Sequence, residues 1–409
     1  MTRILCWLPP LAFVATLLLP LAQELTSFAP RCGLGGVTDS GPAEPPVTLA
    51  AWHDGDLQQW VEARIDRELG LRDWMVRIDN QVRFDLFGVT KRPVVGGPDG
   101  WLVEDGYLTS RTHLMPYQVG HILDRLHELL LAQAVLAEHG VTLLLLITPS
   151  KAETLPQHLP YAYRLVDAAG HRRMIDLVRG VFGFGVLNHL DAQALFETWR
   201  DQEPGFPLFP RSGTHWSRIA AARTVVHLLD EFERLSGVDV VNLDLAPMRM
   251  GTGPGGSEDD MLQLANLYDT TGGADPMPLA RTQRRHGDRG TPPGVLLVSS
   301  SFAWLLTDVL QDPGVAAPLA VYYYFKSVYE WADGRQQPKR PIDWTPEQLR
   351  ADVLRYRFVV LECNASKCME LGFGFPAAVL RAFGLPKSAP AITLEQLASL
   401  QQLVQTDRR

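Results

Sequence analysis

The stretch that decides the fold is Gly140-Val-Thr-Leu-Leu-Leu-Leu-Ile-Thr-Pro-Ser150. Its apolar run, Val141 to Ile147, is short for a helix and is followed at once by turn residues, so it predicts a strand buried on both faces. A helical pattern over about 116–139 precedes it and ends at Gly140, a residue that suits the left-handed cap of a helix. A helix that leads directly into a buried strand is typical of an α/β protein.

The same alternation continues toward the C-terminus. Further strands are expected at 186–190, 295–298, 320–325 and 358–361. One helix is expected at 217–235, with Ser217 as N-cap, and another after the capping box Thr345-Pro-Glu-Gln348. Strands that alternate with helices predict an α/β fold with a mostly parallel sheet and helices on both faces.

The segments around this core set the expected domain boundaries. The spacing of Leu57, Val61, Ile65 and Leu69 predicts one long amphipathic helix over 56–87, and a short hairpin is expected around the turn at 97–100. Residues 240–292 are rich in Gly and Pro and are interpreted as a loop-rich insertion. The expected organisation is a signal segment at 1–24, a linker at 25–50 and one domain at 51–409.

The N-terminal segment is a candidate for membrane insertion. Residues 4–22 form an uncharged apolar run, with Arg3 before it and Glu24 after it. About 19 apolar residues are close to the length that spans a bilayer, and a positive charge ahead of the run places the rest of the chain on the far side. A signal anchor is favoured. A signal peptide cleaved after Ala22 and a buried helix of a soluble domain remain alternatives.

Composition excludes several functional classes. The 409 residues hold 38 Lys and Arg against 46 Asp and Glu, a net charge of −8, so no nucleic-acid partner is expected. The sequence contains no Gly-rich phosphate loop and no cluster with zinc-ligand spacing, so neither a cofactor nor a metal is expected. Cys363 and Cys368 are expected to form a disulfide in an exported chain, with two buried free thiols as the alternative.

Two segments could carry chemistry. In Val298-Ser-Ser-Ser301-Phe302 a serine lies between a predicted strand and a predicted helix, at the sheet edge where α/β proteins build their sites. In Thr214-His215-Trp-Ser217 a histidine lies just ahead of a helix. A neutral imidazole can take the proton of a serine hydroxyl and return it to a leaving group. Each segment also has a plain structural reading, as a helix cap or as a loop histidine.

These segments resemble the alginate O-acetyltransferase AlgJ/AlgX family, whose site motifs are Asp-x-His-Trp and Gly-Asp-Ser-Phe. The resemblance covers about 60–370. It also rests on Gly97-Pro-Asp-Gly-Trp-Leu102, Thr148-Pro-Ser-Lys-Ala152, Leu155-Pro-Gln-His-Leu-Pro160 and Glu362-Cys-Asn364. It implies an SGNH-hydrolase-like fold and O-acetylation of a secreted polysaccharide beside a polytopic MBOAT-type membrane acyltransferase. It further implies a periplasmic protein, anchored in the inner membrane by residues 4–22.

Matched position by position, the resemblance places the nucleophile at Ser301 and the catalytic histidine at His215. Two acidic positions of the family pattern are lost. Gly213 stands two residues before His215, and Ser299-Ser300 replaces Gly-Asp ahead of the nucleophile. Asp191, directly after a predicted strand, is the expected substitute that orients His215, although a helix N-cap is the alternative. A triad without its acid loses on the order of 10⁴ in rate unless another group orients the histidine.

Three further residues are expected near the substrate. Asn364 could donate to an oxyanion or serve in a turn, and Lys151 could bind a sugar hydroxyl or remain solvated. Tyr322, with its two neighbouring tyrosines, could offer aromatic surface to a sugar ring, although strand alternation makes at least one of the three a core residue. The expected function is acetyl transfer through acyl-Ser301, with a carbohydrate esterase or a non-catalytic polysaccharide-binding scaffold as alternatives.

Overall fold

The structure is a computed structural model that describes residues 7–36, 42–112, 116–167, 174–246, 249–251, 258–268, 277–279 and 281–387. The chain divides into two compact units. The first comprises Met1–Val95 and Asp260–Gly273, and the second comprises Gly96–Asp259 and Ala274–Arg409. This division differs from the expected boundary at residue 50, because the helices after the linker and part of the insertion join the N-terminal unit.

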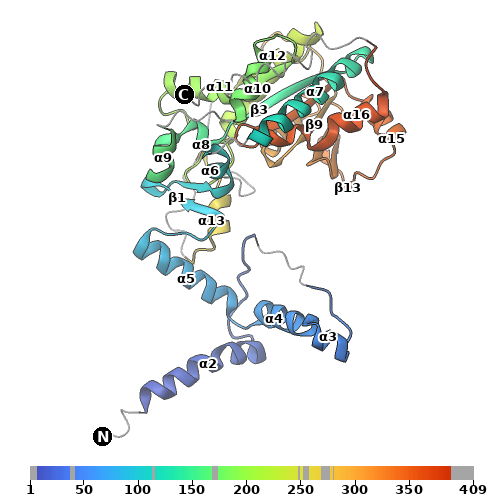
Figure 1. Ribbon diagram of the computed structural model, residues 1–409. Coiled ribbons are helices and arrows are strands. Elements are labelled where there is room, and N and C mark those ends of the chain that lie inside the picture. The colour runs from blue at the N-terminus through green and yellow to red at the C-terminus, as the bar shows by residue number, and fades with distance from the viewer. Residues whose placement is uncertain are drawn as a thin grey trace. The chain divides into compact units, whose positions relative to one another are not determined.

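The first unit is helical. Its elements are α2 (Leu8–Thr26), α3 (Leu49–His53), α4 (Asp56–Glu68), α5 (Arg72–Phe87) and α13 (Asp260–Ala265) (Figure 1). The expected single helix over 56–87 is wrong: it breaks between α4 and α5, where Leu71 adopts a φ of 64°. A side chain at Gly70 would lie 2.1 Å from the Pro20 carbonyl oxygen, so this turn needs glycine to pass α2.

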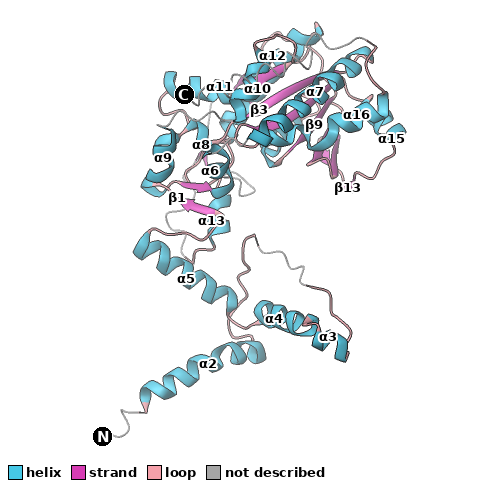
Figure 2. Ribbon diagram, in the orientation of Figure 1, coloured by secondary structure: helices cyan, strands magenta, loops and turns pink. Residues whose placement is uncertain are grey.

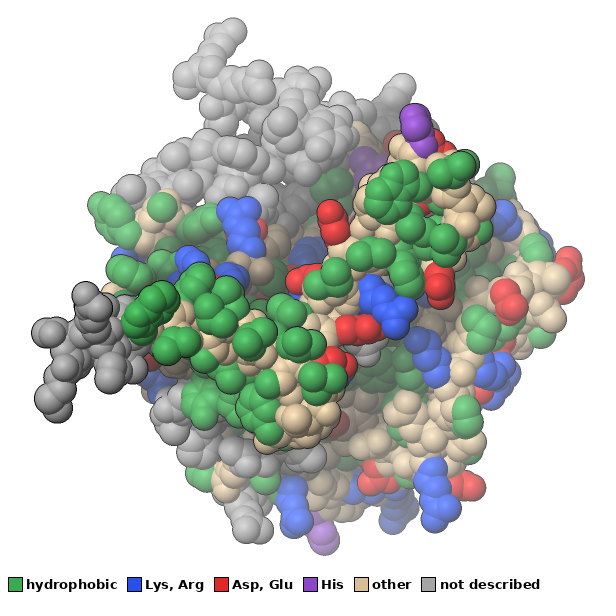
Figure 3. Space-filling model, turned by 90° about the horizontal axis from the view of Figure 1, so that it is seen from below, with side chains coloured by type: hydrophobic (Ala, Val, Ile, Leu, Met, Phe, Trp, Pro, Cys, Tyr) green, Lys and Arg blue, Asp and Glu red, His purple; other side chains and the backbone are tan. Residues whose placement is uncertain are grey.

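Helix α2 is apolar and uncovered. Its segment Pro9–Thr26 is long and apolar enough to cross a membrane, and only 6% of it is buried. Figure 3, seen from below, shows hydrophobic side chains gathered over this helix, among them Phe13, Leu17 and Leu21, all more than half exposed. Such a surface is costly in water, so it is compatible with a membrane anchor or a signal sequence.

The second unit carries the predicted α/β core. Its strands are drawn in magenta in Figure 2. The main sheet has eight strands in the order β12-β11-β10-β9-β14-β3-β4, with β13 also paired to β11. The strands are β3 (Thr142–Thr148), β4 (His189–Asp191), β9 (Val295–Ser299), β10 (Leu319–Tyr323), β11 (Ser327–Ala332), β12 (Arg335–Gln336), β13 (Arg340–Pro341) and β14 (Phe358–Asn364). The run from β10 to β4 is parallel, whereas β11 adds antiparallel pairs.

Helices cover both faces of this sheet, which confirms the expected α/β class. One face packs on α7 (Pro116–Glu138), α10 (Met174–Phe182), α15 (Pro346–Val353) and α16 (Phe375–Phe383). On the other face, Phe232 of α12 (Arg218–Ser236) stacks on Phe358 of β14 with ring centres 4.1 Å apart. The capping box at Thr345 and the N-cap at Ser217 form as the sequence predicts.

The remaining elements are short. They are β1 (Val94–Gly96), η1 (Pro98–Gly100), β2 (Leu102–Glu104), α6 (Asp105–Thr112), α8 (Lys151–Thr154), η2 (Pro156–His158), α9 (Tyr161–Asp167), α11 (Ala192–Gln202), η3 (Ser301–Ala303), α14 (Trp304–Leu310) and η4 (Cys368–Gly374). In the insertion, β5 (Leu243–Leu245) pairs with β8 (Thr282–Arg284), and β6 (Arg249–Gly251) pairs with β7 (Met277–Leu279). The hairpin expected near residue 97 is present as β1 and β2.

Candidate active site

The structure brings Ser301 and His215 together. Ser301 opens η3, directly beyond the C-terminal end of β9, and His215 lies two residues before the N-cap of α12. His215 Nε2 lies 2.9 Å from Ser301 Oγ, within hydrogen-bond distance. Both residues are half-buried. A serine hydroxyl this close to an imidazole can pass its proton to the ring, which is the geometry of an activated nucleophile.

The two segments are joined a second time by their neighbouring aromatic residues. Trp216 is fully buried, and its indole N–H donates to the Phe302 carbonyl at 3.2 Å. The Phe302 ring lies 4.8 Å from the imidazole ring of His215, measured between ring centres. This packing fixes the imidazole loop against the start of η3, so the separation between histidine and serine does not depend on one contact.

The loop that carries His215 is tied to the protein on its other side as well. The backbone N–H of Ser217 donates to Leu208 at 2.9 Å, and the Ser217 hydroxyl donates to the Pro207 carbonyl. The same hydroxyl accepts from the Ala220 N–H at 3.2 Å and so caps α12. The small residue after Trp216 therefore both closes the loop and starts the helix.

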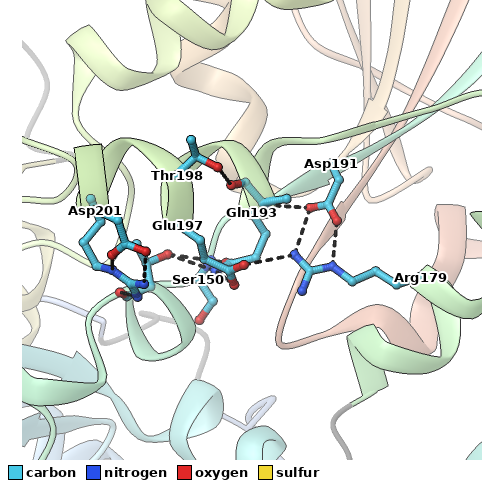
Figure 4. Close-up of polar contacts among 10 residues, drawn as sticks. Ser150, Arg179, Asp191, Gln193, Glu197, Thr198 and Asp201 are labelled. Atoms are coloured by element: carbon cyan, nitrogen blue, oxygen red, sulfur yellow. Dashed lines mark hydrogen bonds and ion pairs between the residues drawn. The ribbon is translucent and has the colours of Figure 1, made fainter. Parts of the chain in front are cut away.

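Asp191 is not the acid that orients His215. It ends β4, which is separated from β9 by β3 and β14. Its carboxylate accepts from Arg179 Nε at 2.7 Å and from the Ala194 N–H at 2.9 Å, where it caps α11 (Figure 4). With strands about 4.8 Å apart, three strand spacings place it far from the imidazole. The helix-cap alternative is therefore the one that the structure supports.

Lys151 is a buried residue with structural contacts and not a solvated one. Only 4% of it is exposed. Its ammonium donates to the carbonyls of Leu102 at 2.9 Å and Arg211 at 3.1 Å, and it lies 5.3 Å from the ring centre of Trp101. It therefore links β2 to the segment that precedes His215.

Asn364 and Tyr322 are likewise engaged in the interior. The Asn364 amide donates to the Pro149 carbonyl at 3.1 Å and accepts from the Ser366 N–H at 3.0 Å, so it shapes a turn, which is the alternative expected from the sequence. The Tyr322 side chain is fully buried, and its hydroxyl donates to Asp352. Burial raises the pKa of this phenol far above its usual range. Of the three tyrosines, Tyr324 is the most exposed, at 37%.

The expected disulfide is absent. Cys363 and Cys368 are both buried, and both are free thiols. The Cys368 thiol donates to the Asn364 carbonyl at 3.3 Å. Hydrogen bonding between Cys363 and Cys368, followed by burial, raises the pKa of Cys363. Two thiols placed in the core with hydrogen-bond partners behave as small apolar residues.

One residue that carries no role in the sequence-based site contacts it directly. Glu362 of β14 is fully buried, and its Oε2 accepts the backbone N–H of Ser300 at 2.7 Å. Its Oε1 accepts the hydroxyl of Thr148. Strand alternation could have located it, because Phe358 and Glu362 lie four residues apart and so share a face of β14. Among the described residues no group of His, Cys, Asp and Glu could hold a metal ion.

The fold and the serine–histidine pair define the class of an SGNH-hydrolase-like protein, and comparisons with known proteins give the family. Residues 94–302, about half of the chain, match the family described as the SGNH hydrolase-like domain of acetyltransferase AlgX. The chain therefore belongs to the AlgJ/AlgX family.

Individual relatives are more distant. Over 189 residues the chain is 27% identical to the probable alginate O-acetylase AlgJ of Pseudomonas aeruginosa, an alignment that spans 46% of this chain and 45% of that protein. The chain thus matches less than half of the length of this curated relative.

Three solved structures are similar to parts of this chain. The O-acetyltransferase domain of Pseudomonas putida AlgJ has 17% identity and a TM-score of 0.41, with coverage of 76% of this chain and 99% of that one. Pseudomonas aeruginosa AlgX has 13% identity and a TM-score of 0.42, with coverage of 71% of this chain and 67% of that one. Bacillus cereus PatB1 has 10% identity and a TM-score of 0.40, with coverage of 68% of this chain and 99% of that one.

Proposed function

We propose that this chain is an O-acetyltransferase that moves an acetyl group to a hydroxyl of a secreted polysaccharide through an acyl-Ser301 intermediate. The observation that carries the proposal is the 2.9 Å separation between His215 Nε2 and Ser301 Oγ. Family membership supports the acetyl group as cargo, because the matching family is described as an acetyltransferase and the curated relative is named an alginate O-acetylase.

In the first half of the reaction, Ser301 Oγ attacks the carbonyl carbon of the acetyl donor while its proton passes to His215 Nε2. The bond from the acetyl carbon to the donor's leaving group breaks, and the proton on His215 goes to that group. In the second half, a sugar hydroxyl gives its proton to His215 and attacks the acyl carbon. The ester bond to Ser301 breaks, and the serine oxygen recovers its proton.

The acceptor decides between transferase and esterase, because water attacking the same acyl-serine gives hydrolysis. A polymer hydroxyl therefore has to outcompete water at the site. We propose that the polymer is met outside the cytoplasm, with α2 as the signal anchor in the inner membrane and the second unit in the periplasm. The acetyl group would be supplied by a polytopic MBOAT-type membrane acyltransferase. The apolar, uncovered segment Pro9–Thr26 supports the anchor.

The test uses the purified protein with p-nitrophenyl acetate as donor and an oligosaccharide of the host's exported polymer as acceptor. The wild type is expected to give acetylated oligosaccharide and a trapped acetyl-Ser301 peptide in mass spectrometry. Ser301→Ala removes the only atom assigned to carry the acyl group, so both signals should disappear. Ser236→Ala, at the far end of α12 from His215, serves as the matched control and should keep both.

Two outcomes would redirect the proposal. Release of free acetate from the wild type without any acetylated acceptor, still dependent on Ser301, would indicate an esterase. Full donor turnover or cellular polymer acetylation by Ser301→Ala would contradict the nucleophile assignment. Ser300→Ala would then be tested, and its neutrality would favour the scaffold alternative.

A further inference from the structure

The candidate site lacks both acids that the family pattern places beside its serine and histidine. Gly213 stands where an aspartate precedes the histidine, and Ser300 stands where an aspartate precedes the nucleophile. In serine–histidine chemistry, the carboxylate holds the imidazole and stabilises the positive charge that the ring gains when it takes the serine proton. A site without that charge is expected to be slow.

A buried carboxyl group comes to this position from the neighbouring strand. Glu362 lies near the C-terminal end of β14, which pairs in parallel with β9 in the register Leu361 to Val298. One step further along this register, Glu362 lies level with Ser299, the last residue of β9 before the nucleophile turn. Strand alternation puts it on the same face of β14 as Phe358, which packs on α12. His215 lies just ahead of that helix.

The contacts of Glu362 are made to the turn itself. Its Oε2 accepts the Ser300 N–H at 2.7 Å, so it holds the residue that directly precedes Ser301. Its Oε1 accepts the Thr148 hydroxyl from the end of β3, the strand on the other side. Only 1% of Glu362 and none of Thr148 is exposed. A buried carboxyl with two hydrogen-bond donors has a fixed orientation, as a positioning group requires.

We propose that Glu362 is the positioning carboxylate of the Ser301–His215 pair: it fixes the turn that carries Ser301 and supplies the negative charge that stabilises protonated His215. The proposal rests on the proposed function. It assigns to a residue on a different strand the electrostatic task of the two acids missing at Gly213 and Ser300.

The groups around the Glu362 carboxyl affect its pKa in opposite directions, and protonation of His215 during the reaction favours the charged carboxylate. Burial raises the pKa of Glu362, whereas the hydrogen bonds from Thr148 and Ser300 and the nearby His215 lower it. A proton arriving on His215 from Ser301 favours the charged form of Glu362, because opposite charges attract strongly in a poorly solvated site. The attraction is thus largest in the transition state, where it accelerates the step.

The primary test is Glu362→Gln in the full-length protein, with donor turnover, acceptor KM and melting temperature measured side by side. Glutamine keeps an oxygen that can accept the Ser300 N–H but loses the charge. We expect kcat to fall by about 100-fold, with KM nearly unchanged and no loss of melting temperature at neutral pH. The rate of Ser301 labelling by phenylmethylsulfonyl fluoride should fall in parallel. Glu370→Gln, an exposed glutamate nearby, is the matched control and should leave all four quantities unchanged.

A charge rescue separates electrostatics from structure. Gly213→Asp, introduced into the Glu362→Gln background, restores the family's acid two residues before His215. We expect it to recover at least about ten-fold of the lost kcat. A purely structural glutamate would not be rescued by a carboxylate on another loop, so failure to recover activity in a folded double variant would count against the proposal.

The outcomes also separate this inference from the proposed function. If the wild type is active and Ser301→Ala is inactive, but Glu362→Gln keeps the wild-type kcat, the proposal for Glu362 is overturned. The proposed acetyltransferase function is then unaffected. If Glu362→Gln does not fold, Thr148→Val and Thr148→Ser replace it. Valine removes the hydroxyl donor and should lower kcat, whereas serine keeps it and should preserve kcat. Equal activity of both would overturn the proposal.

Discussion

His215 Nε2 lies 2.9 Å from Ser301 Oγ although 86 residues separate the two in the chain. The residues that follow them are joined too, because the Trp216 indole donates to the Phe302 carbonyl. In each of the two segments, the first residue, His215 or Ser301, is available for chemistry. The residue after it, Trp216 or Phe302, is fixed in the core. The pairing is therefore a property of two anchored segments and not of two mobile side chains.

His215→Ala and Ser301→Ala should each reduce kcat by on the order of 10⁴-fold or more, and the double variant should be no slower than either single one. The reason is that a nucleophile and its base act as one unit, so their effects do not add. Steady-state turnover of p-nitrophenyl acetate measures this. Additive losses would show that the two residues act in separate steps.

Lys151→Met should destabilise the protein by about 2–4 kcal/mol, because it removes the ammonium that donates to the buried Leu102 carbonyl and to the Arg211 carbonyl, which keeps only the Leu102 N–H. Since Arg211 precedes His215 by four residues, kcat should fall as well. Chemical denaturation and turnover give the two values. Lys326→Met, at an exposed lysine, should change neither. A stable Lys151→Met protein with weakened acceptor binding would instead restore the sugar-binding reading.

Tyr324 and Tyr322 should respond in opposite ways to substitution. Tyr324 is exposed, and its backbone N–H donates to the Ser299 carbonyl at 2.8 Å, so its backbone lies beside the end of the strand that leads to the nucleophile. Tyr324→Ala should raise acceptor KM without changing the melting temperature. Tyr322→Phe should lower the melting temperature, because Asp352 loses a buried donor. An unchanged acceptor KM for Tyr324→Ala would exclude it from the sugar site.

The cysteines should react according to burial. Iodoacetamide should modify exposed Cys32 in the native protein and reach Cys363 and Cys368 only after unfolding. Hydrogen bonding to the Cys368 thiol and burial raise the pKa of Cys363, which keeps it in the unreactive protonated form. Peptide mapping with and without denaturant distinguishes the three sites. A Cys363–Cys368 linked peptide from non-reduced envelope protein would contradict the free thiols.

The stability difference between Glu362→Gln and the wild type should depend on pH. Burial raises the pKa of Glu362 above its ordinary value of 4.5. A raised folded pKa means that the stabilisation is complete below the unfolded pKa and is lost as pH rises through the folded value. The wild type should therefore lose melting temperature relative to Glu362→Gln as pH rises above the ordinary glutamate value of 4.5. A difference that does not change as pH rises above that value would contradict a raised pKa of Glu362.

Local sequence signals determined most of the α/β core. The apolar run 141–147, the capping box at Thr345 and the N-cap at Ser217 each depend on neighbouring residues, and all three form as predicted. The long helix over 56–87 was wrong because apolar spacing continues across Gly70, while the break there is imposed by the approach of α2. The spacing of apolar residues predicts which face of a helix is apolar, but it does not predict where a turn interrupts the helix.

The sequence by itself also determined which serine and histidine to examine, since the family motifs lie on contiguous residues. What only the tertiary structure decided is what each polar side chain contacts. Asp191, Lys151, Asn364 and Tyr322 all lie near strand ends, and each is held by partners in the fold. Glu362 reaches the nucleophile turn because β14 lies between β3 and β9. Strand order is set by packing between distant segments, and no local pattern encodes it.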